Sequence, residues 1–175
     1  MVKARQRWLE QSGLPGDLEP VWSALGDGPG AVVLTEDSQP LGVMRVELAP
    51  DLSWWTAEQR AQTSVLISAA CTLPGRSDRP GRLLTLWARH YTSCLGRRWV
   101  RCEVPSGDEL NGRHSSKFAY LMGTCGWQRA GTRTCRGGGS VVMLQTSAEV
   151  LPSLPALVAS SVPVPAPPAD APAAR

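Results

Sequence analysis

The sequence lacks several features on which whole classes of function depend. No apolar run among its 175 residues approaches the roughly 18–20 residues of a membrane-spanning helix. The first ten residues are charged and have no apolar signal-peptide centre. The net charge is only +3 and the basic residues form no long run, which disfavours nucleic-acid binding. We therefore expect a cytoplasmic protein that neither crosses a membrane nor binds nucleic acid.

Cysteine is too scarce and too widely spaced for a disulfide framework. There are five cysteines, an odd number, in a chain without an export signal. His90 and Cys94 are four residues apart and would share one face of a helix, which makes metal binding the alternative. No CxxC or HxxxH pair completes a four-ligand metal site, however. We interpret the thiols as buried or incidental and expect no metal.

The composition changes towards the C-terminus. Between Leu151 and Arg175 there are seven prolines and seven alanines, and the only charged residues are Asp170 and Arg175. Proline removes backbone donors and alanine offers little surface to bury, so no packed element is expected after about residue 150. We predict one domain over residues 1–148 and a disordered tail over residues 149–175. The tail is either passive or a ligand for a proline-reading domain, and its removal should barely change the melting temperature.

Helix-like and strand-like patterns alternate before the tail. The clearest is a helix from Leu83 to Leu95, where apolar residues recur at helical spacing and Gly96 ends the pattern. Over residues 42–48 the side chains alternate instead, with Met44, Val46 and Leu48 on one face and Val43, Arg45 and Glu47 on the other. Further helices are expected over residues 3–12, 18–25 and 117–124, and further strands over residues 31–34, 65–72, 98–104, 127–134 and 141–145. This order predicts an α/β domain with a mixed, mostly antiparallel sheet flanked by helices.

The loop between the predicted strand 65–72 and the long helix has the composition of a phosphate-binding loop. It reads Leu73-Pro74-Gly75-Arg76-Ser77-Asp78-Arg79-Pro80-Gly81-Arg82. Amides at a helix start have no intrahelical partner and lie at the positive end of the helix dipole, so they bind phosphate. Pro80 suits the first helical turn, because its missing N–H would have no partner there. Three arginines add charge, although a plain loop with solvated arginines is the alternative.

At this loop the chain resembles the GNAT family of acetyl-CoA-dependent N-acetyltransferases. The family carries an Arg/Gln-x-x-Gly-x-Gly/Ala loop, which corresponds here to Arg76-Ser77-Asp78-Arg79-Pro80-Gly81, with Arg79 in place of the middle glycine. Residues 82–88 resemble the family's third helix, and residues 118–127 resemble its final helix and Gly-Phe signature. Arg7-Trp8-Leu9 and Gln39-Pro40-Leu41-Gly42 are similar to one bacterial branch. The resemblance covers about residues 5–146.

The resemblance implies transfer of an acetyl group from acetyl-CoA to a primary amine of a small molecule or peptide. It implies a sheet that splays at its centre, where main-chain amides near Cys71 and Thr72 hold the acetyl and pantetheine groups. The loop would hold the pyrophosphate. The cofactor-binding residues are therefore predicted to be Cys71, Thr72, Arg76, Ser77, Asp78, Arg79, Pro80, Gly81, Arg82, Ser115 and Met122.

Two departures from the family pattern favour a second interpretation. Met122 stands where the family often has a tyrosine that protonates the departing thiolate, and Tyr120 would lie about 200° away around an α-helix. The side chain of Arg79 either weakens the amide cradle or contacts phosphate directly. The alternative is a catalytically degenerate domain that binds coenzyme A or a protein partner.

The general base and the acceptor site are open. A carboxylate commonly accepts the proton of an attacking amine, and the strand over residues 65–72 contains no acid. Glu47, Asp51 and Glu103 are candidates by topology, each equally readable as an ordinary surface acid, and Tyr120 is a further catalytic candidate. Trp54 and Trp55 either line an acceptor pocket or anchor their loop to the core.

The start of the sequence raises a question about the sheet edge. Family members have a strand before the first helix, and here Met1 lies almost at that helix. Either the true start lies upstream, or the sheet lacks an edge strand and exposes its neighbour. An exposed edge would permit a homodimer contact.

Overall fold

The computed structural model describes residues 30–75, 79–105, 118–135, 139–163 and 165–166, together with Arg7 and Gln11. The helices predicted over residues 3–12 and 18–25 therefore lie outside the described residues, apart from those two positions. Arg76, Ser77, Asp78 and Ser115, which we predicted to bind the cofactor, also lie outside them.

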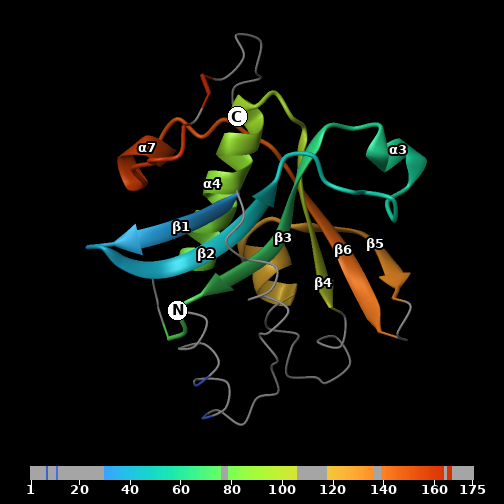
Figure 1. Cartoon of the computed structure of the whole chain (residues 1–175), viewed down its shortest axis with the longest axis horizontal. Helices are drawn as coiled ribbons and strands as arrows, with labels where there is room; N and C mark the ends of the chain where they lie inside the picture. Colours follow the sequence, from blue (N-terminus) through green and yellow to red (C-terminus); the bar gives the residue numbers. More distant parts are fainter. Residues whose placement is uncertain are drawn as a thin grey trace. The chain divides into compact units, whose positions relative to one another are not determined.

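The described strands form one six-stranded sheet (Figure 1), in the order β1-β2-β3-β4-β6-β5. They are β1 (Ala31–Glu36), β2 (Gln39–Glu47), β3 (Ser64–Thr72), β4 (Trp99–Pro105), β5 (Gln128–Thr134) and β6 (Ser140–Ser147). The pairs β1–β2, β4–β6 and β5–β6 are antiparallel. The mostly antiparallel sheet expected from the sequence is confirmed, and each of its described strands falls on a predicted one.

The helices are α3 (Ala57–Arg60), α4 (Pro80–Cys94) and α7 (Leu154–Leu157), with a π-helical turn η1 (Tyr120–Thr124). In α4 the buried side chains recur at helical spacing, and Leu84, Trp87 and Ala88 are at most 6% exposed. Gly96 follows with φ +68°, a conformation that glycine adopts easily, so the helix ends there. The strongest helix prediction is confirmed. No helix of the described residues combines the length and the apolar character needed to cross a bilayer.

The chain divides into two compact units. The first contains the residues up to Glu47 and Ile67–Thr85. Its hairpin of β1 and β2 (Figure 1) turns at Asp37 and Ser38, whose φ angles of +47° and +64° are those of a type I′ turn. The predicted alternation over residues 42–48 is only partly right: Val43 is buried, and Leu48, beyond the end of β2, is 42% exposed.

The second unit contains Leu48–Leu66 and the chain from Leu86 onward. Its core lies along the paired strands β4 and β6, where Val100, Val142 and Leu144 are at most 1% exposed. The backbone N–H groups of Arg98 and Trp99 both donate to the carbonyl of Thr63. These bonds tie the start of β4 to the segment that contains α3.

The C-terminal segment differs from its prediction. No packed element was expected after about residue 150, yet α7 forms there and Leu154 is only 4% exposed. The backbone N–H of Leu151 donates to Nδ1 of His90 over 3.1 Å. The prediction was wrong for this part because a few leucines between prolines suffice to bury apolar surface, whatever the average composition. Residues 167–175 lie outside the described residues.

Candidate functional site

Arg79 stands at the middle glycine of the family pattern and has a left-handed backbone conformation, which glycine adopts most easily. Its φ is +55°, in the left-handed region that a non-glycine residue enters at a cost of about 1–2 kcal/mol. The chain therefore makes a turn that suits glycine although an arginine stands at this position. Its side chain is exposed.

The loop enters α4 as predicted from the sequence. Arg79 precedes the first helical residue, Pro80, and its carbonyl accepts from the N–H groups of Arg82 at 2.9 Å and Leu83 at 3.4 Å. Arg82 is exposed in the first helical turn, three residues beyond Arg79. Two guanidinium groups at the N-terminus of a 15-residue helix suit a phosphate-bearing ligand, because fixed charge and helix dipole act in the same direction.

The end of β3 carries the residues predicted to hold the acetyl and pantetheine groups. Cys71 is 7% exposed, Thr72 is half-buried, and the Cys71 Sγ lies 3.9 Å from the Thr72 carbonyl oxygen. The N–H of Leu73 donates to the carbonyl of Leu41 over 2.8 Å. The amide of Leu73 is therefore engaged within the protein and is not available to a ligand.

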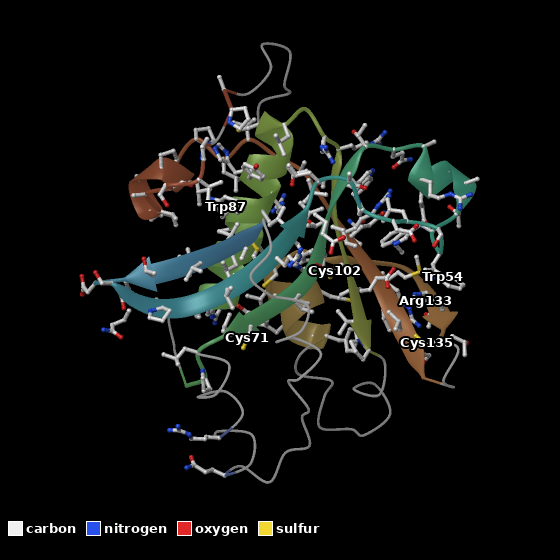
Figure 2. The ribbon with its side chains drawn as sticks, in the orientation of Figure 1. Trp54, Cys71, Trp87, Cys102, Arg133 and Cys135 are labelled. Carbon is white, nitrogen blue, oxygen red and sulfur yellow. The ribbon has the colours of Figure 1, made fainter. Side chains whose placement is uncertain are left out.

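A second group of candidates lies together in the other unit. The indole Nε1 of Trp55 donates to Oε1 of Glu103 over 3.3 Å. Arg133 donates to the other oxygen of Glu103 from Nη2 at 2.6 Å and from Nε at 3.2 Å. The guanidinium of Arg133 lies 5.2 Å above the ring of Trp54 (Figure 2). We call Trp54, Trp55, Arg101, Glu103 and Arg133 the Trp–Arg cluster.

The two adjacent tryptophans have different environments. Trp55 is 2% exposed and Trp54 is 55% exposed. Of the two interpretations of the pair, anchoring the loop therefore describes Trp55, whereas Trp54 presents its ring to solvent. Both residues lie in a turn, which is closed by the N–H of Trp55 donating to the carbonyl of Leu52 over 2.9 Å.

Sequence reasoning missed both arginines of the cluster. Arg101 is 0% exposed and lies 4.6 Å above the ring of Trp55. It donates to the carbonyl of Gln59 over 2.6 Å and to Oγ of Ser64 over 3.3 Å. Burial lowers the pKa of Arg101, whereas the hydrogen bond to Glu103 raises the pKa of Arg133. An arginine in a strand pattern is normally taken as solvent-facing, so no local signal marks Arg101.

The short helix α3, also absent from the sequence prediction, did have a signal. Thr56 and Gln59 form a capping box in which each side chain accepts from the other's backbone N–H, over 3.2 and 3.0 Å. The spacing Thr-x-x-Gln is the sequence signature of this motif. Gln59 also donates from Nε2 to the carbonyl of Ala130 in β5 over 3.2 Å.

The remaining acidic candidates lie outside the Trp–Arg cluster. Glu47 is half-buried at the end of β2. Asp51 is exposed, and its Oδ1 accepts from the backbone N–H of Ser53 over 2.9 Å. That bond is a local turn contact of the kind that aspartate commonly makes.

The segment that carries Met122 and Tyr120 is a π-helical turn rather than a regular α-helix. The N–H of Cys125 donates to the carbonyl of Tyr120 over 3.1 Å, five residues back. The separation of about 200° between the two side chains assumed α-helical geometry, and that assumption was wrong. Met122 is 46% exposed and Tyr120 is half-buried.

His90 and Cys94 share one face of α4, as their spacing predicted. Nε2 of His90 lies 3.7 Å from Sγ of Cys94, and Nδ1 accepts from Leu151. An Nδ1 that accepts must be unprotonated, so the ring proton is on Nε2 and points to the thiol. Burial lowers the pKa of His90 and raises the pKa of Cys94. Within the part of the chain that the structure describes, no three potential metal ligands gather.

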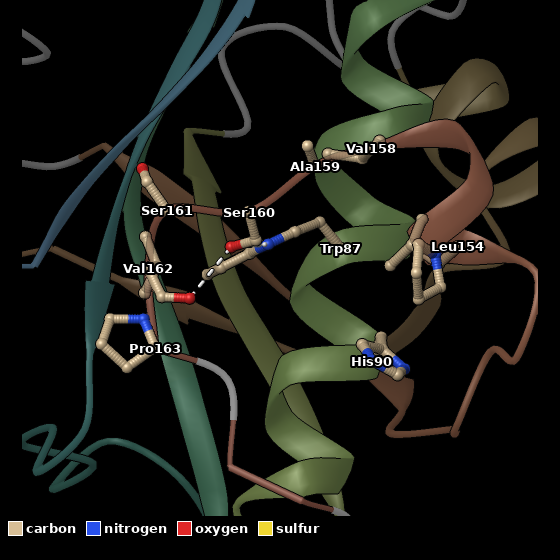
Figure 3. A pocket seen from close by; sticks show the side chains of 10 residues that line it. Trp87, His90, Leu154, Val158, Ala159, Ser160, Ser161, Val162 and Pro163 are labelled. Atoms are coloured by element: carbon tan, nitrogen blue, oxygen red, sulfur yellow. Dashed lines mark hydrogen bonds between the residues drawn. The ribbon is translucent and has the colours of Figure 1, made fainter.

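A cavity of about 390 Å³ lies between α4 and the C-terminal segment (Figure 3). Trp87 and His90 line it from α4, and Leu154, Pro155 and residues 158–163 line it from the other side. The indole N–H of Trp87 donates to Oγ of Ser160 over 3.4 Å, and that hydroxyl donates to the carbonyl of Val162 over 3.1 Å. These bonds fasten the C-terminal segment to the helix.

Comparison with known proteins gives a fold and no close relative. No protein-family model matches the chain, and no curated protein matches it by sequence. Among solved structures, a GNAT-family acetyltransferase from Listeria monocytogenes 4b F2365 matches over 81% of this chain and 82% of its own, at 12% identity and a TM-score of 0.56.

Two further matches have lower TM-scores. The ribosomal-protein-S18-alanine N-acetyltransferase from Escherichia coli has a TM-score of 0.48 at 13% identity, over 80% of this chain and 78% of its own. A putative acetyltransferase from Salmonella typhimurium, in complex with acetyl-CoA, has a TM-score of 0.47 at 13% identity. The match covers 87% of this chain and 76% of the Salmonella chain. At such identities the likeness concerns the fold, and it rests on the Listeria structure. The chain has the fold of the GNAT acetyltransferases.

Proposed function

We propose that this protein is a divergent GNAT enzyme that transfers an acetyl group from acetyl-CoA to a primary amine. The observation that carries the proposal is the loop before α4, where Arg79 makes a glycine-like turn at φ +55°. The turn occurs at the position of the family's middle glycine, on the family's fold. Holding an arginine in that conformation costs free energy, which favours a functional reason for the turn.

The residues at the start of α4 fit the pyrophosphate of coenzyme A. Arg79 and Arg82 are exposed at a helix N-terminus, where Pro80 has no N–H to leave unpaired. Arg76, Ser77, Asp78 and Gly81 complete the proposed contact set, with Ser115 and Met122 elsewhere in the chain. Bound acetyl-CoA supplies a reactive thioester, and the protein's task is to orient it.

The proposed reaction needs little chemistry from the side chains. The amine nitrogen forms a bond to the thioester carbonyl carbon, the carbon–sulfur bond breaks, and coenzyme A leaves as a thiolate. Main-chain amides near Cys71 and Thr72 would stabilise the negative charge on the carbonyl oxygen. Water protonates the leaving thiolate, because Met122 has no proton to donate. Proximity and orientation then provide most of the acceleration.

The proton of the attacking amine requires a base, for which the candidates remain Glu47, Asp51, Glu103 and Tyr120. Both carboxylate oxygens of Glu103 accept hydrogen bonds, from Trp55 and from Arg133. Glu103 would therefore have to release a partner to act as a base. Asp51 is exposed, whereas Glu47 is half-buried like Glu103, so Asp51 is the most accessible of the three carboxylates. We place the enzyme in the cytoplasm, where it would act as a monomer or homodimer and without nucleic acid.

A second candidate is a domain that binds coenzyme A or a protein partner without catalysis. The observation in its favour is Met122, which is 46% exposed at the family's tyrosine position. Such a domain would acetylate no amine, whether it binds coenzyme A or a protein partner.

Calorimetric titration of the full chain with acetyl-CoA, beside plain coenzyme A, tests the proposal. We expect micromolar binding that the double variant Arg76→Ala/Arg82→Ala weakens by about tenfold or more, since a charged hydrogen bond contributes about 1.5–3 kcal/mol. Arg98→Ala is the matched control, because Arg98 is exposed and lies outside the loop. Absence of binding at millimolar cofactor would reject the proposal. Binding without acetylation of any amine would favour the second candidate.

A further inference from the structure

Trp54 is the most exposed tryptophan described, and it is held in place. Its ring is 55% exposed, and the guanidinium of Arg133 lies 5.2 Å from the ring centroid. A single exposed apolar side chain is ordinary on protein surfaces. The contact with Arg133, which restrains this ring, is the feature that requires an explanation.

The restraint extends from Arg133 into the protein. Two nitrogens of Arg133 donate to one oxygen of Glu103, at 2.6 and 3.2 Å, so its guanidinium cannot rotate freely. The other oxygen of Glu103 accepts from Trp55 at 3.3 Å. The exposed ring of Trp54 is therefore pre-organised by groups that are only 22–23% exposed, which lowers the entropy that a ligand must overcome on stacking.

Arg101 supports the same loop at a cost in free energy. It is completely buried over the ring of Trp55, and its hydrogen bonds go to neutral oxygens, the carbonyl of Gln59 and the hydroxyl of Ser64. Among the described residues its Nε has no hydrogen-bond partner. Burying a guanidinium without a carboxylate is unfavourable, and an apolar side chain would anchor the loop more cheaply. This favours a role for the loop beyond folding.

The charge of the Trp–Arg cluster indicates which ligands would stack there. The cluster has two guanidinium groups and one carboxylate, hence a net charge of +1, and both oxygens of that carboxylate are engaged. A polyamine carries several ammonium groups and needs several free carboxylates, which the cluster does not provide, whereas an aryl-substituted monoamine carries a single ammonium group that can remain in solvent. The open face of an indole ring instead offers apolar and aromatic contact area.

We propose that Trp54 is a stacking platform for an aromatic small molecule of the aryl-substituted amine class, and that this platform discriminates against polyamines. This inference rests on the proposed acetyltransferase function in one respect: such a ligand is an acetyl acceptor only if the protein is an acetyltransferase. The stacking itself is a property of the cluster. Arg133, Glu103 and Arg101 act as positioning residues that hold the ring.

Saturation-transfer NMR with the full chain, in the absence of coenzyme A, tests the platform. The probes are phenethylamine, which has a ring, and spermidine, which has none. Trp54→Ala should weaken phenethylamine binding about two- to tenfold, the range expected for one aromatic pair. Trp54→Phe should retain the binding. Leu157→Ala is the matched control, because Leu157 is 67% exposed and belongs to α7.

Three outcomes would overturn the inference: equal phenethylamine binding by Trp54→Ala and Leu157→Ala, tighter binding of spermidine than of phenethylamine, or no saturation transfer to phenethylamine. If the protein also acetylates phenethylamine, Trp54→Ala should raise KM and leave kcat unchanged. Arg133→Ala should have the same effect, and Arg133→Lys should partly restore KM. Because the NMR titration contains no cofactor, a failure of the acetyltransferase proposal would leave the stacking result intact and distinguishable.

Discussion

The indole nitrogen of Trp55 lies 3.3 Å from a carboxylate oxygen of Glu103, 48 residues away in the sequence. Through this bond the loop after β2 is connected to the middle of β4. The other oxygen of the same carboxylate binds Arg133 of β5, so one acidic residue connects three separate segments. A residue in that position has a structural role whatever its part in catalysis.

Glu103→Gln should destabilise the protein modestly. Glutamine can still accept from Trp55, but it loses the charge partner of Arg133. For an ion pair whose side chains are 22–23% exposed, we expect the free energy of unfolding to fall by roughly 1 kcal/mol, measured by urea denaturation. The control is Glu58→Gln, an exposed acid of α3. Equal stability of the two variants would contradict the assigned role.

Arg79→Gly should stabilise the fold relative to Arg79→Ala. Alanine keeps the strain of a positive φ, whereas glycine removes it and costs some entropy in the unfolded chain. The expected difference is about 0.5–1 kcal/mol in favour of glycine, measured by thermal and urea denaturation. If alanine proved the more stable, Arg79 would not hold φ at +55° in solution. In the same samples, both variants should bind coenzyme A more weakly if the guanidinium contacts phosphate.

Stability should fall as the pH drops below about 6.5, because His90 is held neutral. Burial lowers its pKa from the ordinary value of 6.5, so between the folded pKa and 6.5 the unfolded chain binds more protons than the folded one. The stabilisation is therefore complete above 6.5 and is lost as the pH falls through the folded pKa.

The comparison variant for this pH effect is His90→Gln, whose side-chain oxygen can still accept from Leu151. Melting temperatures should be measured from about pH 7.5 to about pH 5.5. The wild type should lose more stability over this interval than the variant. Parallel profiles would show that His90 does not contribute the pH dependence.

Leu154→Ala should cost about 2 kcal/mol, since removal of a buried leucine side chain has that order of effect. Leu157→Ala, in the same short helix, should cost almost nothing, because Leu154 is 4% exposed and Leu157 is 67% exposed. Deletion of residues 151–175 should lower the melting temperature at least as much as Leu154→Ala. If the deletion leaves the melting temperature unchanged, the C-terminal segment does not pack on α4 in solution.

Much of the fold was predictable because its signals are local. The helix α4 follows from apolar residues at helical spacing between Pro80 and Gly96, and both ends were predicted from those two residues. The hairpin of β1 and β2 likewise follows from two short apolar runs around a polar turn. The π-helical turn at Tyr120 was not predictable in this way, because a segment of five residues is too short to reveal a period different from that of an α-helix.

The candidate site likewise has one part that was predictable from local signals and one part that was not. The loop before α4 could be recognised from its sequence, since neighbouring residues supply both the turn and the charge. The Trp–Arg cluster could be guessed only in part: Trp54, Trp55 and Glu103 were separate candidates, and neither arginine was among them. Their contacts depend on how β4, β6 and β5 pair, and a one-residue shift in register would turn Glu103 or Arg133 to the opposite face.

The sequence alone determined the succession of the described strands, the helix α4 and the entry of the preceding loop into it, because each depends on residues close together in the chain. Only the tertiary structure decided that Arg101 is buried while Trp54 is exposed. It also decided that Leu154 packs within a proline-rich segment and that Glu103 connects Trp55 to Arg133. These are outcomes of contacts between residues 30 or more positions apart, and burial at such a distance is set by packing, which no local pattern records.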